Sequence, residues 1–227
     1  MNAPPTPHDR TAADAWFAAI RARLASPLTG PRGQRGLGHE LGFGRHAGPP
    51  PADARSAAVL VLLYPSDSQW RLPLILRPQR MGTHAGQVAF PGGMLEEPES
   101  LCECAIREAH EELGIAAESL ELLGELSPVY IFASNFRVSA FVAGTHERPQ
   151  FHPDAREVEE LLELPVSALW EESRQGRHVI ERQGVQFETP HLEWQGRRIW
   201  GATRVMLGEL ACVLADATER AAAGAPN

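Results

Sequence analysis

The chain has 227 residues, 43% of them hydrophobic and 22% charged, a composition typical of a globular protein with one substantial core. Its formal net charge of −8 argues against a general nucleic-acid binder, because phosphate backbones are held by clustered Lys and Arg side chains. Its three cysteines are too few for a disulfide framework, and its longest apolar run, residues 57–64, is far shorter than the roughly 20 residues that cross a bilayer. We therefore expect a cytoplasmic protein without a membrane anchor.

The first 55 residues predict one helix followed by a loop. Apolar side chains at helical spacing indicate an amphipathic helix that starts near Thr11. Its apolar face comprises Trp16, Phe17, Ile20 and Leu24. Residues 26–56 are rich in Gly and Pro and indicate a wrapping loop rather than a second domain. We expect residues 1–55 to form an N-terminal segment attached to one main domain over residues 56–227.

The main domain is expected to begin with strands. Residues 57–64 and 70–77 are apolar runs on either side of the turn sequence PSDSQ, which together predict a hairpin. Two further β-rich runs follow at 127–133 and 136–144. Strand candidates continue over residues 178–200, where two Gln-Gly pairs mark turns.

Two helices complete the predicted elements. Ser100 and Glu103 match a capping box and Gly114 suits the position after a helix, so a helix is expected over 101–113. Apolar residues at helical spacing predict a second, C-terminal helix that begins near Gly201. Strands before and after a short central helix indicate either an α+β fold or an α/β sandwich with a mixed sheet.

The central helix carries a concentration of acidic side chains. Glu108, Glu111 and Glu112 fall within roughly 100° of arc on one side of the helix. The apolar side, expected to face the core, comprises Cys102, Ala105, Ile106, Ala109 and Leu113. Because like charges at helical spacing repel, helix stability does not explain the acidic side. It is either a solvated face or a site for a hard divalent cation, which is most stable where carboxylates crowd.

The spacing of the whole segment favours the cation site. Its fixed positions are Gly93, Glu99, Arg107, Glu108, Glu111, Glu112 and Gly114, followed by an apolar residue. This pattern resembles the Nudix box, and every fixed position is filled. The resemblance implies an α/β/α sandwich with a mixed sheet. It also implies an enzyme that binds Mg²⁺ or Mn²⁺ and hydrolyses a nucleoside diphosphate linked to another group.

The same resemblance implies roles for the residues of the box. Glu108, Glu111 and Glu112 would be the metal ligands. Arg107 would pair with Glu99 and hold the preceding loop against the helix. Two further positions, Gly92 and Gly93, would let the backbone turn sharply and approach the metal or a phosphate.

The general base that activates the attacking water has three candidates. Glu112 is the first choice within the box. Nudix enzymes also take this base from a distant loop or strand, where Glu157 and Glu160 are the candidates in this chain. Such a base must reach the water at hydrogen-bond distance, so the three are alternatives that spacing alone leaves open.

The segment before the box indicates a substrate. Residues 77–93, RPQRMGTHAGQVAFPGG, are similar to the signature of the coenzyme A pyrophosphatase branch of the Nudix family. The matching positions are Arg77, Gly86, Phe90, Pro91, Gly92 and Gly93. The resemblance implies hydrolysis of coenzyme A or a derivative to 3′,5′-ADP and 4′-phosphopantetheine. Arg77 and Arg80 are the predicted phosphate contacts, with Arg137 a further candidate.

One departure from the signature motivates an alternative substrate. Gly82 stands where the signature has a second Arg. The alternative is a Nudix hydrolase of another nucleoside diphosphate, such as ADP-ribose, NADH or a capped RNA end. A second alternative, from a different class, is a nucleotide sensor without catalysis, which the intact box disfavours.

Overall fold

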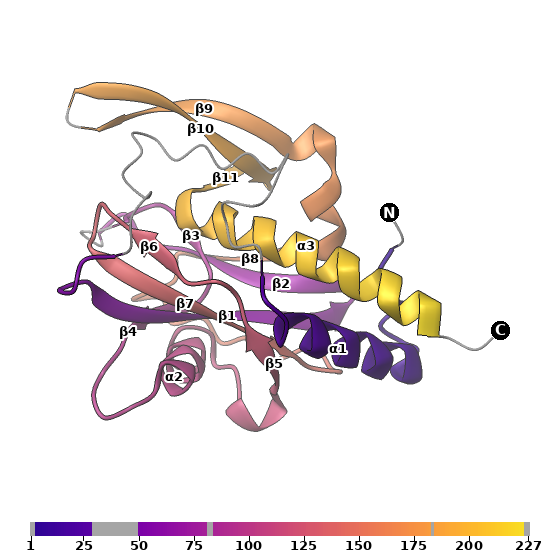
Figure 1. The fold of residues 1–227 in the computed structure, drawn as a ribbon. Helices are drawn as coiled ribbons and strands as arrows, with labels where there is room; N and C mark the ends of the chain where they lie inside the picture. Colours follow the sequence, from indigo (N-terminus) through magenta and orange to yellow (C-terminus); the bar gives the residue numbers. More distant parts are fainter. Residues whose placement is uncertain (1–2, 29–49, 81–83, 183, 225–227) are drawn as a thin grey trace.

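A mixed sheet with helices on both faces forms the body of the protein (Figure 1). The computed structural model describes residues 3–28, 50–80, 84–182 and 184–224. The architecture is the α/β sandwich with a mixed sheet that the sequence predicts. Most of the expected wrapping loop, residues 29–49, lies outside the described residues.

In chain order the strands of the large sheet come first, interrupted by one α-helix, and the strands of the small sheet follow before the last helix. The helices are α1 (Arg10–Leu24), α2 (Leu101–Leu113) and α3 (Gly201–Gly224), with 3₁₀ turns η2 (Ala117–Ser119), η3 (Val166–Trp170) and η4 (Glu172–Arg174). The large sheet contains β1 (Arg55–Ser66), β2 (Gln69–Leu76), β3 (Val88–Ala89), β4 (Gly92–Met94), β5 (Glu121–Glu125), β6 (Val129–Ile131), β7 (Phe136–Gly144) and β8 (Glu160–Pro165). The small sheet contains β9 (Gln175–Arg182), β10 (Val185–Trp194) and β11 (Arg197–Trp200).

Strand β1 is the centre of the large sheet. It pairs antiparallel with β2 through a two-residue turn in which Asp67 and Ser68 both have positive φ, as in the predicted hairpin. On its other side it runs parallel to β7, from Arg55 opposite Phe136 to Leu63 opposite Gly144. Strand β4 also pairs with β1, and β8 pairs with β2. These pairings bring the loop after β4 and the segment before β8 to the same region.

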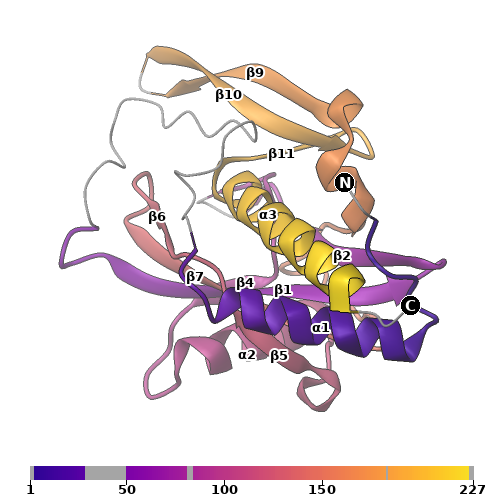
Figure 2. The ribbon, with the colours of Figure 1, turned by 45° about the vertical axis from the view of Figure 1, so that its right-hand side comes forward.

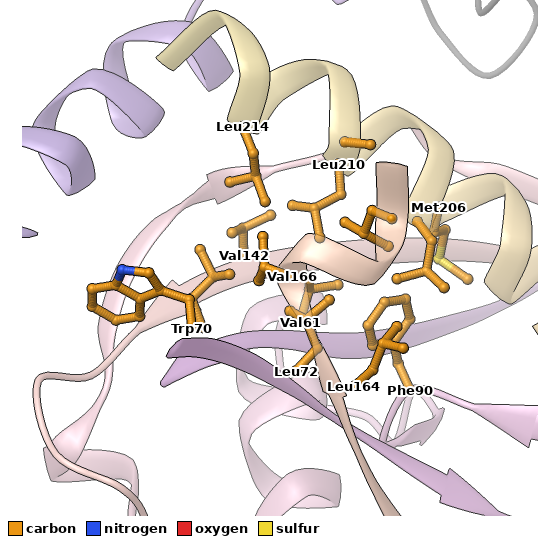
Figure 3. Close-up of a cluster of buried hydrophobic side chains, with 14 of the residues drawn as sticks. Val61, Trp70, Leu72, Phe90, Val142, Leu164, Val166, Met206, Leu210 and Leu214 are labelled. Atoms are coloured by element: carbon orange, nitrogen blue, oxygen red, sulfur yellow. The ribbon is translucent and has the colours of Figure 1, made fainter. Parts of the chain in front are cut away.

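Two apolar clusters lie on opposite faces of the large sheet, because side chains alternate along a strand. On one face, residues of β1 such as Leu60 and Leu62 pack with Ala105 and Leu113 of α2. On the other face the sheet packs against α1 and α3. Figure 3 shows part of this second cluster, with Leu210 and Leu214 of α3 facing the sheet. The box helix and the C-terminal helix therefore cover opposite faces.

Helix α2 has the predicted bounds. The Ser100 hydroxyl accepts a hydrogen bond from the Glu103 backbone N–H at 3.2 Å, and the Glu103 carboxylate accepts one from the Ser100 N–H at 2.7 Å. Gly114 ends the helix with φ of 70°. The predicted core face is correct only in part. The buried residues are Cys104, Ala105, Ala109, Glu112 and Leu113, whereas Cys102 and Ile106 are partly exposed, because β4 and β1 pack closer to the Cys104 side.

The strands predicted over residues 178–200 form the small sheet. Gln195 and Gly196, both at positive φ, make the turn between β10 and β11. Figures 1 and 2 place this sheet on the α3 side of the large sheet, away from α2. Strands β5 and β8 are not among the predicted elements. Among the described residues, no helix combines the length and the apolar character needed to cross a membrane.

Candidate active site

Three carboxylates from two separate parts of the chain meet on the α2 face of the sheet. Glu108 and Glu112 lie one helical turn apart on α2, and Glu157 comes from the segment that precedes β8. Each offers an oxygen atom, and the three oxygens lie within 4.8 Å of one another. We call Glu108, Glu112 and Glu157 the acid cluster.

Glu112 is the most buried member of the acid cluster. Its side chain is 1% exposed, and its Oε2 accepts a hydrogen bond from the Gly92 N–H at 2.9 Å. Its Oε1 lies 3.8 Å from Nη1 of Arg77. Burial raises the pKa of Glu112 to about 8, and the Gly92 N–H and Arg77 offset this only in part. Without a bound cation, Glu112 therefore holds a proton at neutral pH.

Glu108 is also partly buried, and its position explains why residue 93 is a glycine. Burial raises the pKa of Glu108, while the Arg107 guanidinium opposes the shift. A Cβ atom at position 93 would lie 2.2 Å from Oε1 of Glu108, so any residue other than Gly93 would displace the carboxylate. At Gly92, a Cβ atom would lie 2.3 Å from the Ala58 carbonyl oxygen of β1. The two glycines let β4 pack against β1 and against the acid cluster at once.

Arg107 connects the loop before α2 to the acidic side of the helix. Its Nε and Nη2 donate to the two oxygens of Glu99 at 2.9 and 2.8 Å, a bidentate pair. This pair holds the pKa of Glu99 down at about 2. Nη1 of Arg107 also donates to Glu108 and to Glu111, both at 3.0 Å.

Glu111 is placed differently from the other two acids of the box. Its side chain is 54% exposed, and it contacts Arg107 rather than the acid cluster. The carboxylate that joins Glu108 and Glu112 is Glu157, a position that the box pattern does not contain. Helical projection groups Glu111 with Glu112, but the segment packed on the helix buries only Glu112.

The segment that carries Glu157 is bonded to the end of α2. The His152 N–H donates to the Leu113 carbonyl at 2.8 Å, and the Asp154 N–H donates to the Glu112 carbonyl at 2.9 Å. At its other end the Glu159 N–H donates to the Leu76 carbonyl at 2.8 Å. The first two bonds use carbonyls that a helix end leaves unpaired, and together with the third they place Glu157 beside the acids of α2.

Glu160, the other distant candidate for the base, lies on the opposite face of the sheet. Leu161 packs in the cluster on the α2 side, whereas Leu162 packs on the α3 side, so alternation puts Glu160 on the α3 side. Its carboxylate accepts from Arg197 of β11 at 2.8 and 3.1 Å. The structure therefore does not bring Glu160 to the acid cluster.

The predicted phosphate contacts occupy three different settings. Arg77 lies beside Glu112, and its Nε is buried without a hydrogen-bond acceptor in the described part of the chain. Arg80 donates from Nη2 to the carbonyls of Ala155 and Arg156. Arg137 is exposed at the start of β7. Gly82 lies outside the described residues.

Comparison with known proteins identifies the family. The NUDIX domain family matches residues 54–183, which is more than half of the chain. The chain belongs to the Nudix hydrolase family. Nudix hydrolases generally use divalent metal ions, and the acid cluster offers the oxygen ligands that such ions take.

Named relatives agree with this membership. The chain is 37% identical over 166 residues to the "uncharacterized Nudix hydrolase NudL" of Pectobacterium atrosepticum, an alignment that covers 71% of this Nudix chain and 84% of the relative. The protein of the same name from Yersinia enterocolitica is 36% identical, with 70% and 82% covered. A Nudix hydrolase structure from M. smegmatis, RenU, has a TM-score of 0.43 and 24% identity, covering 50% of this chain and 72% of that one.

The burial of Glu112 predicts a stability penalty that grows with pH. With a folded-state pKa of about 8 against an ordinary value of 4.5, the unfolded chain releases a proton that the folded chain retains. Between these values the free energy of unfolding of the metal-free protein should fall as pH rises, by at most about 1.4 kcal/mol per pH unit. Glu112→Gln removes this contribution. Urea denaturation in EDTA from pH 5 to 8 should show the variant gaining stability relative to wild type, and parallel pH profiles would contradict the assignment.

Proposed function

We propose that this protein hydrolyses the pyrophosphate bond of coenzyme A or a derivative, with Mg²⁺ or Mn²⁺, to give 3′,5′-ADP and 4′-phosphopantetheine. The observation that carries the proposal is the approach of three carboxylate oxygens, from Glu108, Glu112 and Glu157, to within 4.8 Å of one another. Carboxylates this close repel one another, and burial adds to the cost of their charge. A divalent cation among them turns the repulsion into attraction.

The donor set fits a hard cation. All three ligands are carboxylate oxygens, which Mg²⁺ and Mn²⁺ prefer to nitrogen or sulfur. The raised pKa of Glu112 shows that no protein cation compensates its charge fully. When bound, the ion would neutralise pyrophosphate oxygens and lower the pKa of a bound water. In this proposal Glu108, Glu112 and Glu157 hold the ion, and Glu111 supports the site through Arg107.

Two basic side chains and two glycines shape the substrate side of the site. Arg77 lies beside the acid cluster with its side chain 21% exposed, which suits its guanidinium to a phosphate oxygen of the substrate. Gly92 and Gly93 let the β4 backbone come close to the same place. Arg107, paired with Glu99, keeps the loop before α2 on the helix. These residues bind and orient, and none forms a covalent bond to substrate.

The proton of the attacking water has two candidate acceptors in this arrangement. Glu112 lies within the acid cluster, so it would be close to a water bound to the ion, as a general base must be. Glu157 is less buried and belongs to the same acid cluster. We propose that one of these two carboxylates accepts the proton while water attacks phosphorus directly.

The choice of coenzyme A rests on the segment 77–93. Two backbone bonds join Arg77 to the middle of this segment, from the Arg77 N–H to the Gln87 carbonyl at 3.1 Å and from the Gly86 N–H to the Arg77 carbonyl at 3.0 Å. Two signature positions have structural roles here. Gly86 has φ of 66°, a conformation that favours glycine, and Phe90 is 1% exposed and packs in the core. Arg77 stands at the neck of the loop, beside the acid cluster. Coenzyme A, with a 3′-phosphate in addition to its pyrophosphate, suits a site that has arginines next to its metal ligands.

A product analysis tests the substrate. Purified protein with coenzyme A and Mg²⁺ should yield 3′,5′-ADP and 4′-phosphopantetheine, separated by chromatography, and no product in EDTA. Turnover should exceed that of ADP-ribose, NADH and capped RNA at equal concentration. Faster hydrolysis of one of these would identify it as the substrate in place of coenzyme A, and the proposed reaction type would stand. Binding of coenzyme A without hydrolysis would instead identify a sensor.

A matched pair of variants tests the acid cluster. Glu112→Gln and Glu157→Gln should each lower kcat/KM by at least about 10-fold, because each removes a proposed metal ligand. Glu160→Gln, on the opposite face, removes only a half-exposed ion pair with Arg197 and should stay within about twofold of wild type. Circular dichroism checks the fold of all three. An equal loss in Glu160→Gln, or near-normal activity in Glu112→Gln, would contradict the assignment.

A further inference from the structure

The contacts of Arg80 differ from those of a phosphate-binding side chain. Its Nη2 donates to the Ala155 carbonyl at 2.6 Å and to the Arg156 carbonyl at 2.9 Å. Both acceptors belong to the main chain, and Glu157 is the next residue. A guanidinium that binds carbonyls makes charge-assisted hydrogen bonds, which are stronger than bonds between neutral groups. Arg80 therefore binds the backbone immediately before Glu157, a member of the acid cluster.

Backbone hydrogen bonds hold both ends of the segment around Glu157, and Arg80 binds the residues between them. Backbone bonds from His152 and Asp154 hold its beginning to α2, and one from Glu159 holds its end to β2. Between Asp154 and Glu159, the Asp154 carbonyl accepts from the N–H groups of Glu157 and Val158, which forms a local turn. Val158 anchors the end of this turn by packing in the apolar cluster on the α2 side. The bonds from Arg80 go to the carbonyls of Ala155 and Arg156, so they tie the residues just before Glu157 to another part of the chain.

The position of Glu157 needs such support because its neighbours repel it. The charge of Glu157 contributes to the raised pKa of both Glu108 and Glu112, so the three acids interact unfavourably. The nearest arginine in sequence, Arg156, attracts Glu157 only weakly, because its guanidinium binds the Asp154 carboxylate at 2.6 Å and its side chain is 85% exposed. Without a fixed backbone, Glu157 would move away from the other two carboxylates.

We propose that Arg80 is a positioning residue for Glu157, which it holds at the metal site by bonding the carbonyls of Ala155 and Arg156. The inference rests on the proposed function, in which Glu157 is a metal ligand. It replaces the expectation that Arg80 contacts a phosphate. It also assigns different roles to the two arginines of the same segment, because Arg77 lies beside Glu112 and Arg80 binds the backbone before Glu157.

Binding of Mn²⁺ without substrate tests this role apart from catalysis. Free Mn²⁺ is followed by electron paramagnetic resonance while the purified full-length protein is titrated. In Arg80→Ala the dissociation constant for Mn²⁺ should rise by about 10-fold or more, the range for residues that orient metal ligands. Arg80→Lys should show a smaller rise, because an ammonium group can reach one of the two carbonyls but lacks the guanidinium fork.

Two controls separate positioning from charge. Arg156→Ala removes the same charge one residue from Glu157 but leaves both carbonyl contacts in place, so its Mn²⁺ binding should stay within about twofold of wild type. In a Glu157→Gln background, Arg80→Ala should add no further loss, because its effect passes through Glu157. At saturating Mn²⁺, the KM for coenzyme A should change by less than about threefold in Arg80→Ala, less than the loss in metal binding.

The possible outcomes discriminate between the two roles. Unchanged Mn²⁺ binding in Arg80→Ala with a large rise in KM would make Arg80 a phosphate contact and overturn the inference, leaving the proposed function intact. An equal loss in Arg156→Ala, or additive losses in the Glu157→Gln background, would also overturn it. Failure of the wild-type protein to bind Mn²⁺ would instead contradict the proposed metal site, and the inference with it.

Discussion

The approach of Glu108, Glu112 and Glu157 against their mutual repulsion is the constraint on which the rest of the site depends. Helix α2 and the segment before β8 are held in place so that their carboxylates come together. A capping box and Gly114 set the bounds of α2, and the carbonyls at its end accept the N–H groups of the segment that carries Glu157. The end of the helix therefore supports the third acid as well as supplying the first two.

Arginines surround the acid cluster, and each one contacts a different partner. Arg107 binds Glu99 through both oxygens and also reaches Glu108, so it joins the loop to the helix and balances part of the acidic charge. Arg77 lies 3.8 Å from Glu112, close enough to attract it but beyond hydrogen-bond distance. Arg80 donates to the main-chain carbonyls of Ala155 and Arg156. The compensation is incomplete, as the raised pKa of Glu112 shows. This deficit is what a divalent cation would supply.

Local patterns in the sequence predicted the bounds of the helix but not which third carboxylate lies beside Glu108 and Glu112. Helix α2 has its predicted bounds because Ser100, Glu103 and Gly114 act within a few residues of the helix ends. The separation of Glu111 from Glu112 depends on what packs against the helix, which no helical projection contains. The place of Glu157 depends on the pairing of β8 with β2, and β8 itself was not predicted, since its glutamates interrupt the apolar alternation of a strand. Arg80 was predicted as a phosphate contact from its place in the signature segment, and its bonds to carbonyls could not be foreseen because these lie some 75 residues away in sequence.

Titration of the metal-free protein with Mn²⁺, followed by electron paramagnetic resonance, tests most directly whether the acid cluster is a cation site. The account predicts saturable binding by the wild-type protein and its loss or strong weakening in Glu108→Gln. Glu160→Gln should bind like wild type, because its carboxylate lies on the other face of the sheet. Absence of saturable binding, or binding that survives unchanged in Glu108→Gln, would contradict the account.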